Sequence, residues 1–290
     1  MHLHSLYGLV VAASRRLPAA AGSGAPDIVI HEHPHRRLSP HPPNPRGYSY
    51  ATLDSGEIHV SWSELFDFVV SSDGARIDVY AEPARGTEPV YTYLISQVIS
   101  VALLQQGIES LHASAVAIDG KAIVLVGDSG FGKSTLTAAL LQRGALLVTD
   151  DLLVLEERDG AYDVAPGACR LKLDPATAAM LGINWPGVPM ADGSGKLVYL
   201  LPESKCARAP LPLAAIVLLA PLSQRPMIEE VSLAEATRAL LAATFNPLHN
   251  EPERLAALLR NAEKTARGTR IRRLHVPRDL ENISSVTALI

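Results

Sequence analysis

Residues 121–151 constrain the fold of this chain more than any other stretch, and they read KAIVLVGDSGFGKSTLTAALLQRGALLVTDD. Their centre matches G-x-x-x-x-G-K-[ST] without a gap, from Gly127 to Ser134. Upstream, residues 122–126 form a continuous apolar run that is typical of a strand buried on both faces. Downstream, apolar residues at helical spacing are followed by Gly144, which suits the end of a helix. The order strand, glycine loop and helix predicts a phosphate-binding loop in an α/β protein.

A loop of this kind binds the phosphates of a nucleotide. Its backbone N–H groups converge on an anion, and the following helix adds the partial positive charge of its N-terminus. We expect Lys133 to reach the β- and γ-phosphates and the hydroxyl of Ser134 to ligate Mg²⁺. The residues predicted to contact the nucleotide are Gly127, Asp128, Ser129, Gly130, Phe131, Gly132, Lys133, Ser134 and Thr135.

A second feature closes the same stretch, where the apolar run 145–149 ends on Asp150 and Asp151. A carboxylate at the end of a neighbouring strand holds Mg²⁺ in phosphate-loop proteins. Side chains of adjacent strand residues point to opposite faces, so both aspartates reach a nucleotide only if the chain bends there. One interpretation gives one aspartate to the metal and makes the other the acceptor of a hydroxyl proton. The alternative is one metal ligand beside one loop or helix-capping aspartate.

Three motifs resemble the catalytic domain of bacterial HPr kinase/phosphorylase. They are the segment LHASAV at 111–116 with His112, the loop GDSGFGKS at 127–134, and the strand end VTDD at 148–151. The LHASAV segment is similar to that of HPr-kinase-like proteins that accompany ribosomal-peptide clusters, including kinases of lasso-peptide precursors. The resemblance covers about residues 95–152 and is looser toward the C-terminus. It implies a phosphate-loop kinase domain of the HPr kinase C-terminal type.

The resemblance also implies an activity, ATP-dependent phosphorylation of a serine in a peptide or protein, with ATP and Mg²⁺ as cofactors. It places His112, Asp150 and Asp151 near the acceptor serine and the metal, so that Ser134 and the two aspartates form the metal set. Read without the resemblance, His112 is equally a core histidine at the start of a strand. The favoured acceptor is a ribosomal precursor peptide of the lasso type, and HPr is the alternative acceptor.

One departure from the HPr kinase pattern concerns a later signature, roughly R-G-x-G-I-I-N, that is tied to the reverse phosphorylase reaction. This chain has PGACRLKL at 166–173 in that neighbourhood. Arg170 remains as a tentative phosphate or substrate contact, and the alternative is a surface arginine. Lys196, which follows the glycine-rich segment 191–195, is a second tentative contact, and the alternative is a solvated lysine. That segment is loose enough to form a lid.

We expect a β-rich N-terminal region at 1–100, with a Pro/His-rich loop at 31–46, followed by the phosphate-loop kinase domain at 101–290. Residues 5–13 are predicted to form one strand, and residues 91–106 a helix with a broad apolar face. Histidines alternate at 31, 33 and 35, which suggests a metal site. Because a proline interrupts them, we favour a solvated loop.

The overall composition narrows the possible partners and compartments. A formal net charge of −4 gives no general attraction to nucleic acid, and no apolar run approaches the length of a membrane span. Cys169 and Cys206 form neither a metal-ligand spacing nor a disulfide framework, so we expect a reducing, cytoplasmic location. Basic residues gather at 260–273, either as a solvated face or as a docking surface for an acidic peptide. We also expect a homo-oligomer.

Two rival functions stay open at this point. One is a small-molecule kinase on the same scaffold, which also resembles phosphoenolpyruvate carboxykinase, but we can place neither its carboxylate-binding arginine pair nor its further metal ligands. The other is a nucleotide-gated regulatory protein without turnover. The presence of Lys133, Ser134 and both aspartates favours a kinase over this second rival.

Overall fold

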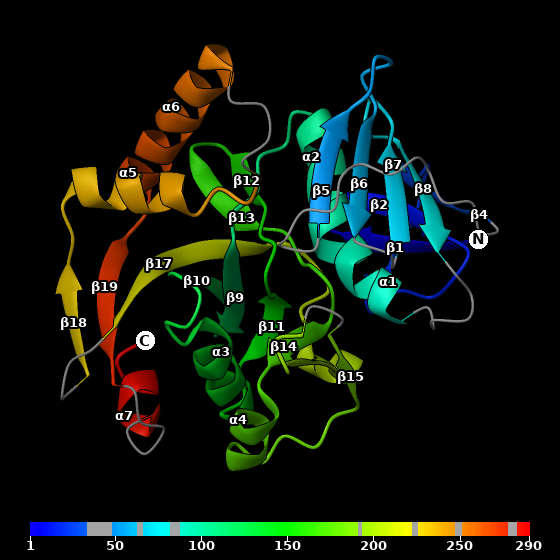
Figure 1. Cartoon of the computed structure of the whole chain (residues 1–290). Coiled ribbons are helices and arrows are strands. Elements are labelled where there is room, and N and C mark those ends of the chain that lie inside the picture. Colours follow the sequence, from blue (N-terminus) through cyan, green and yellow to red (C-terminus); the bar gives the residue numbers. More distant parts are fainter. Residues whose placement is uncertain are drawn as a thin grey trace.

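The computed structural model describes residues 1–33, 48–62, 66–81, 88–190, 193–221, 226–246, 251–277 and 283–290. Two units, each built on a β-sheet, lie side by side (Figure 1). The first sheet contains β1 (His2–Leu6), β2 (Leu9–Ala13), β3 (Ala20–Ala21), β4 (Ile28–His33), β5 (Tyr48–Thr52), β6 (Ile58–Trp62), β7 (Phe66–Val70) and β8 (Arg76–Ala81). Its described strands run in the order β3-β1-β2-β4-β8-β7-β6-β5.

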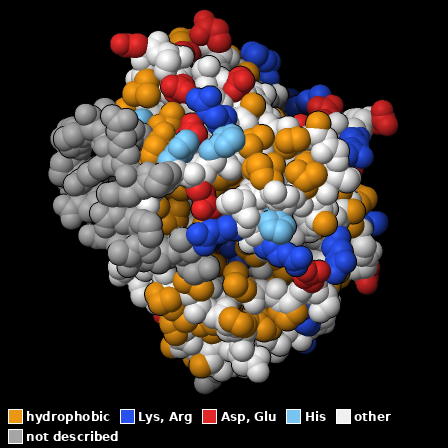
Figure 2. All heavy atoms as spheres, turned by 90° about the vertical axis from the view of Figure 1, so that its right-hand side faces the viewer, with side chains coloured by type: hydrophobic (Ala, Val, Ile, Leu, Met, Phe, Trp, Pro, Cys, Tyr) orange, Lys and Arg blue, Asp and Glu red, His pale blue; other side chains and the backbone are white. Residues whose placement is uncertain are grey.

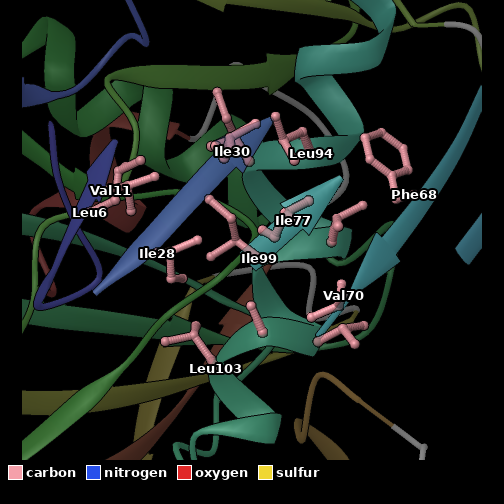
Figure 3. Close-up of a cluster of buried hydrophobic side chains, with 14 of the residues drawn as sticks. Leu6, Val11, Ile28, Ile30, Phe68, Val70, Ile77, Leu94, Ile99 and Leu103 are labelled. Carbon is pink, nitrogen blue, oxygen red and sulfur yellow. The ribbon is translucent and has the colours of Figure 1, made fainter. Parts of the chain in front are cut away.

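A helix covers one face of this sheet, as the apolar face at 91–106 predicts. It runs through α1 (Glu88–Tyr93), a π-helical turn (Leu94–Val98) and α2 (Ile99–Gln105). Its buried side chains Leu94, Ile99 and Leu103 lie against the sheet (Figure 3). The strands supply Ile28, Ile30, Phe68, Val70 and Ile77 to the same core. The first core therefore extends through the helix to Leu103.

The first two strands differ from the prediction of one strand over 5–13. They form a hairpin in which Leu6 pairs with Leu9, and the turn residues Tyr7 and Gly8 have φ of 56° and 86°. A two-residue turn of this left-handed kind matches the twist of the strands it joins. Tyr7 is buried in the core rather than exposed at the turn, so its packing offsets the backbone strain. Alternation of apolar residues continues through the turn, which is why the sequence suggested one strand.

The two units also share apolar packing. Leu152, Val154, Ala165 and Ala168 belong to the second unit, yet they lie in the same buried cluster as the N-terminal sheet and its helix. Burying these side chains contributes roughly 25 cal/mol for each Å² of apolar surface removed from water. The N-terminal unit is therefore packed against the second unit rather than tethered to it.

The second unit is a sheet with helices on both faces (Figure 1). The sheet contains β9 (Ala113–Ile118), β10 (Lys121–Val126), β11 (Leu146–Thr149), β12 (Leu155–Arg158), β13 (Ala161–Val164), β17 (Leu211–Pro221), β18 (Met227–Glu230) and β19 (Ile271–Val276). Its helices are α3 (Lys133–Gln142), α5 (Leu233–Ala242), α6 (Pro252–Gly268) and α7 (Ile283–Thr287). A smaller sheet of β14 (Arg170–Leu173), β15 (Gly187–Pro189) and β16 (Leu197–Leu200) adjoins α4 (Pro175–Met180).

Strand β10 shows why this unit needs helices on both faces. Val124 packs in the cluster with Leu240 of α5, whereas Leu125 packs in the cluster with Leu136 of α3. Both faces of β10 are thus buried, as its continuous apolar run predicts. The sequence correctly predicts the α/β fold, the strand at 122–126 and the helix that follows the loop. A capping box at Ser232 opens α5, because Ser232 and Glu235 bond each other's backbone N–H.

None of the helices in the described parts of the chain has the length and apolarity needed to cross a membrane.

The two cysteines correct one expectation, because Cys169 and Cys206 form a disulfide with their Cα atoms 5.8 Å apart. They lie 37 residues apart in sequence, a spacing that matches no motif. Tertiary pairing brings them together, since the Leu201 N–H bonds the Cys169 carbonyl and Cys206 then follows a 3₁₀ turn (Glu203–Lys205). The prediction that the cysteines form no disulfide was wrong. The expected cytoplasmic location therefore no longer draws support from them.

The disulfide should stabilise the fold measurably. Replacing both cysteines, as Cys169→Ser with Cys206→Ser, should lower the free energy of unfolding by about 3–4 kcal/mol, because the crosslink restricts the unfolded chain. Urea unfolding with and without dithiothreitol measures the effect. The wild type should lose stability in the reductant and the double variant should not respond to it. If dithiothreitol left the unfolding midpoint of the wild type unchanged, that result would contradict the disulfide pairing.

Candidate active site

The site lies at one edge of the second sheet, where several chain ends meet. Strand β10 is parallel to β17, so both end at this edge, at Val126 and Pro221. Strand β9 is antiparallel to both β10 and β11, so its start and the end of β11 lie at the same edge. The topology thus brings His112, the glycine loop and the Asp150–Asp151 pair together. Their convergence, unlike their order in sequence, is a property of the fold.

The glycine loop has the shape of an anion cradle. Gly130 and Gly132 have φ of 88° and 87°, and a Cβ added at either would meet open space. The carbonyl of Asp128 accepts from the Phe131 N–H at 3.2 Å, which tightens the turn. At Gly127, by contrast, a Cβ would lie 3.1 Å from Leu219, so packing excludes a side chain there. The loop therefore leaves room for a phosphate group above its glycines.

Lys133 is buried beneath this loop, and among the described residues it bonds only to main-chain carbonyls. Its Nζ donates to the carbonyls of Gly127 and, at 3.4 Å, Asp128. Burial lowers the pKa of Lys133, and the carboxylates of Asp150 and Asp151 oppose that shift. A cation held by carbonyls can turn toward a phosphate without breaking an ion pair. The loop and its lysine thus fit a nucleotide, and Ser134 and Thr135 begin helix α3 beside them.

The chain bends at the two aspartates, and such a bend is required if both side chains are to face one site. Strand β11 ends at Thr149, and Asp151 has a φ of 78°. The Ser114 hydroxyl donates to Asp150 Oδ1 at 2.6 Å, and the Lys172 N–H donates to Oδ2 at 3.0 Å. Both oxygens of the buried Asp150 are therefore hydrogen-bonded by the protein.

Asp151 is bound by two basic side chains. Lys172 Nζ lies 2.5 Å from its Oδ2, and His112 Nδ1 lies 3.4 Å from its Oδ1. His112 Nδ1 is also 3.2 Å from the Asp151 carbonyl oxygen, so the ring contacts both main chain and side chain. His112 is therefore part of this cluster and not a histidine of the apolar core.

The electrostatics separate the two aspartates. Burial and the neighbouring Asp151 raise the pKa of Asp150. Burial alone would raise the pKa of Asp151 too, but Lys172 and His112 outweigh it and hold the pKa below its ordinary value. Burial lowers the pKa of His112, with Asp151 opposing, so its imidazole tends toward the neutral form. Asp151 is thus the carboxylate that stays ionised most readily.

Arg170 is buried, not a surface arginine, with 4% of its surface exposed. Its Nη2 has no hydrogen-bond partner among the described residues. Burial lowers the pKa of this guanidinium, while Tyr7, Asp151 and Asp150 oppose the shift. A buried cation with a spare donor beside two carboxylates fits the predicted role in phosphate or substrate contact.

The remaining predicted positions lie at or beyond the rim. Lys196 is exposed, yet its charge lowers the pKa of Lys133, so it lies within electrostatic reach of the loop. Residues 191–192 of the predicted lid and residues 34–47 of the Pro/His-rich loop lie outside the described residues. His33 bonds Asp78 at 2.7 Å and stacks on Tyr80. The described residues contain no group of three or more His, Cys, Asp or Glu placed to hold a metal.

Magnesium does not need such a group, because it is usually bound by one or two carboxylates together with substrate phosphates. The donor set here, the Ser134 hydroxyl and the carboxylates of Asp150 and Asp151, is of that kind. The assignment of these three residues to the metal therefore stays a prediction.

Sequence reasoning missed two residues of this cluster, Lys172 and Ser114. Lys172 lies two positions after Arg170 in β14, and side chains at that spacing share one face of a strand, so the alternation would have found it. Ser114 lies two positions after His112, but His112 precedes β9, which begins at Ala113, so alternation within the strand does not link the two.

A pocket of about 480 Å³ opens beside the loop. Its wall includes His112, the loop from Gly127 to Ser129, and Phe131. Helix α5 and strand β19 form the opposite wall, which carries Arg238 and Arg273. The pocket therefore runs from the glycine loop to a wall that carries Glu235 beside Arg238 and Arg273.

Known proteins match the part of the chain that builds this edge. Residues 105–172 match the family described as the HPr Serine kinase C-terminal domain. This segment is HPr kinase-like. It contains His112, the glycine loop, the aspartate pair, Arg170 and Lys172.

The curated relatives are HPr kinase/phosphorylases, matched over short stretches. The Mycoplasmopsis pulmonis protein is 33% identical over 70 residues, covering 23% of this chain and 23% of that protein. The Lactobacillus delbrueckii protein is 38% identical over 71 residues, covering 23% and 22%. The Prosthecochloris aestuarii protein is 36% identical over 104 residues, covering 36% and 28%. The chain thus spans about a quarter of the length of the curated relatives it matches.

Among solved structures, the Hpr(Ser) kinase/phosphatase from Coxiella burnetii matches with a TM-score of 0.27 and 18% sequence identity. The match covers 52% of this chain and 94% of that one.

The ion pair between Lys172 and Asp151 should be strongly coupled. Lys172→Met should lower the free energy of unfolding by about 3 kcal/mol, because it leaves a buried carboxylate short of a cation. Adding Asp151→Asn should recover most of that loss, and urea unfolding of the four proteins gives the coupling. Lys264→Met is the matched control, since its partner Glu157 is exposed, and it should have a much smaller effect. Equal effects of the two lysine substitutions would contradict the assigned geometry.

Proposed function

We propose that this chain is a kinase that transfers the γ-phosphoryl group of ATP to a serine hydroxyl of a polypeptide. One observation carries the proposal: an HPr kinase-like segment places a phosphate cradle, a buried lysine and a charged aspartate pair at one sheet edge. Phosphoryl transfer requires mainly positioning and neutralisation of charge, and this edge supplies groups for both.

The proposed roles follow from the contacts. Lys133 and the loop amides from Gly127 to Thr135 hold the phosphates. Ser134 and one of the two aspartates hold Mg²⁺, which supplies charge neutralisation when bound. The other aspartate accepts the proton of the acceptor hydroxyl.

The neighbouring basic residues compensate the negative charge of the aspartate pair at this edge. Lys172 compensates the charge of Asp151, and Arg170 lies close enough to act on both carboxylates. His112 lies between Asp151 and the pocket, so it borders the space where an acceptor hydroxyl would enter. Its lowered pKa keeps the ring able to accept as well as donate a hydrogen bond near neutral pH.

The pocket beside the loop is the proposed entry for the acceptor. The pocket touches Gly127 to Ser129, the first residues of the glycine loop. Lys133, where helix α3 begins, lies at the other end of the loop in sequence. Arg238 is exposed in its wall, and no ion pair is found for it among the described residues. Arg273 in the same wall pairs with Glu229 and Glu235. Arg238 is thus the cation best placed to meet an acidic residue near the acceptor serine.

The basic segment 260–273 is less suited to that task than its sequence suggested. Its charges are largely paired: Lys264 with Glu157, Arg267 with Glu263, and Arg270 with Glu230. Exposed pairs of this kind mostly make a solvated surface. The charge available to a docking peptide therefore lies in the pocket wall and not along this segment.

For the acceptor itself we propose a ribosomal precursor peptide of the lasso type. Two features of the sequence support it: the LHASAV segment at 111–116, and PGACRLKL at 166–173 in place of the signature tied to the reverse reaction. HPr is the alternative, favoured by the names of the curated relatives. A small-molecule acceptor and a nucleotide-gated protein without turnover are the remaining rivals.

Loss of the loop lysine should abolish transfer. Lys133→Met should reduce phosphorylation of a candidate precursor peptide on the order of a hundredfold or more, because it removes the cation that contacts the phosphates. Mass spectrometry after incubation with ATP and Mg²⁺ should show a gain of about 80 Da on serine with the wild type. Lys121→Met is the control and should retain activity, because Lys121 lies at the exposed start of β10, the strand that leads into the loop.

The same assay separates the rivals. Phosphorylation of HPr but of no precursor peptide would overturn the acceptor and keep the kinase. Labelled phosphate on a small molecule would identify a small-molecule kinase. No transfer from ATP to any acceptor in host lysate would leave a regulatory protein.

Arg238 gives a separate test of the acceptor pocket. Arg238→Glu should raise the KM for an acidic peptide roughly threefold to tenfold and leave the KM for ATP unchanged, because one exposed charge contact is reversed. A peptide with lysine in place of the acid should regain part of the loss. Arg260→Glu on the exposed side of α6 is the control. A rise in the KM for ATP instead would assign the pocket to the nucleotide.

A further inference from the structure

Tyr7 at the tip of the β1–β2 hairpin belongs to the N-terminal unit but is inserted against the second unit. Only 1% of its surface is exposed. Its backbone N–H donates to the Pro166 carbonyl at 2.8 Å, and its hydroxyl donates to the Ile95 carbonyl at 3.0 Å. A Cβ added at Gly167 would lie 2.7 Å from the tyrosine ring. The hairpin tip is therefore wedged between the helix of its own unit and residues 166–168.

The segment that Tyr7 contacts leads directly into the candidate site. Residues 166–168 precede β14, the strand that carries Arg170 and Lys172. The Gly167 N–H bonds the Val148 carbonyl at 2.8 Å, which ties the same segment to the strand that ends at the aspartates. The backbone of Ala168 lies close enough to the Tyr7 hydroxyl to lower its pKa, against the larger effect of burial. Tyr7 thus lies where the two strands that supply the charged groups meet.

The orientation of Arg170 depends on the residues packed around it. The Arg170 guanidinium is buried and its Nη2 has no partner among the described residues, so packing rather than hydrogen bonding sets its orientation. Tyr7 lies close enough to this guanidinium for the two groups to interact. Burial raises the pKa of Tyr7, so the phenol stays neutral and offers a dipole rather than a charge. The tyrosine can therefore hold the segment without competing with Asp151 for the cations.

The backbone of Tyr7 is a further indication that the side chain matters. Its φ of 56° lies in the left-handed region, which a bulky side chain adopts only at a cost. Glycine or asparagine would serve the turn with less strain. A tyrosine here costs turn stability, and in return it contacts both the helix of its own unit, at Ile95, and residues 166–167 of the second unit.

We propose that Tyr7 is a positioning residue of the phosphotransfer site. It holds residues 166–168 in place, so that β14 presents Arg170 and Lys172 to the aspartate pair. This inference rests on the proposed kinase function for its kinetic consequence. It implies that the second unit is incomplete without the N-terminal hairpin.

Tyr7→Phe in the full chain tests the proposal, because it removes the hydroxyl that anchors the ring to the Ile95 carbonyl and so loosens the contact of the ring with residues 166–168. We expect kcat to fall on the order of tenfold, since a small displacement of charged groups is costly in phosphoryl transfer. The KM for ATP should stay within about twofold, because the loop is untouched. Ile77→Val is the matched control: it weakens the same N-terminal core and should lower stability without lowering kcat.

A second readout does not depend on catalysis. The coupling between Lys172 and Asp151, from urea unfolding of the two single variants and the double variant, should fall by about half or more in the Tyr7→Phe background. In the Ile77→Val background that coupling should be unchanged. A purely structural tyrosine would lower overall stability and leave the coupling intact.

The two readouts keep the two claims distinct. If the wild type transfers no phosphoryl group, the kinase proposal fails, and the coupling alone decides the role of Tyr7. If the wild type is active but Tyr7→Phe keeps both full kcat and full coupling, the positioning role is wrong and the kinase stands.

Discussion

The buried charge cluster around Asp151 is the constraint on which the rest of the site depends. A carboxylate pair withdrawn from water is stable only if cations and donors reach it. Here the pair and its partners come from three different strands. Ser114 comes from β9, the aspartates follow β11, and Lys172 comes from β14. The site therefore exists only when the main sheet and the small sheet are both folded and in contact.

This dependence explains why the two units are packed rather than loosely joined. The strand that delivers Lys172 is preceded by residues 166–168, and the N-terminal hairpin holds those residues through backbone bonds. Apolar side chains of both units fill one cluster at the same place. Figure 2 views the molecule from the side of the N-terminal unit and shows basic and acidic side chains interspersed there. The N-terminal unit contains such pairs, Arg15 with Glu32 and Arg76 with Glu57.

Local pattern predicted the glycine loop, its strand and its helix, because each depends on neighbouring residues alone. The bend at the aspartates was the condition of one of two interpretations. Alternation could also have assigned Lys172, which shares a strand face with Arg170. The hairpin turn at Tyr7 could not be predicted this way, because the apolar pattern runs through it and tertiary packing offsets the strain. The Cys169–Cys206 bond likewise depends on strands that pair far apart in sequence.

The disulfide also changes what a break in the backbone would mean. It closes a covalent ring that contains β14, α4, β15 and β16, the whole of the smaller sheet. A protease that cuts inside this ring leaves one covalent molecule, in which Lys172 is still joined to the main sheet from one side or the other. Only reduction after the cut would divide the chain into two pieces. The disulfide thus gives residues 170–205 a second covalent connection to the rest of the chain.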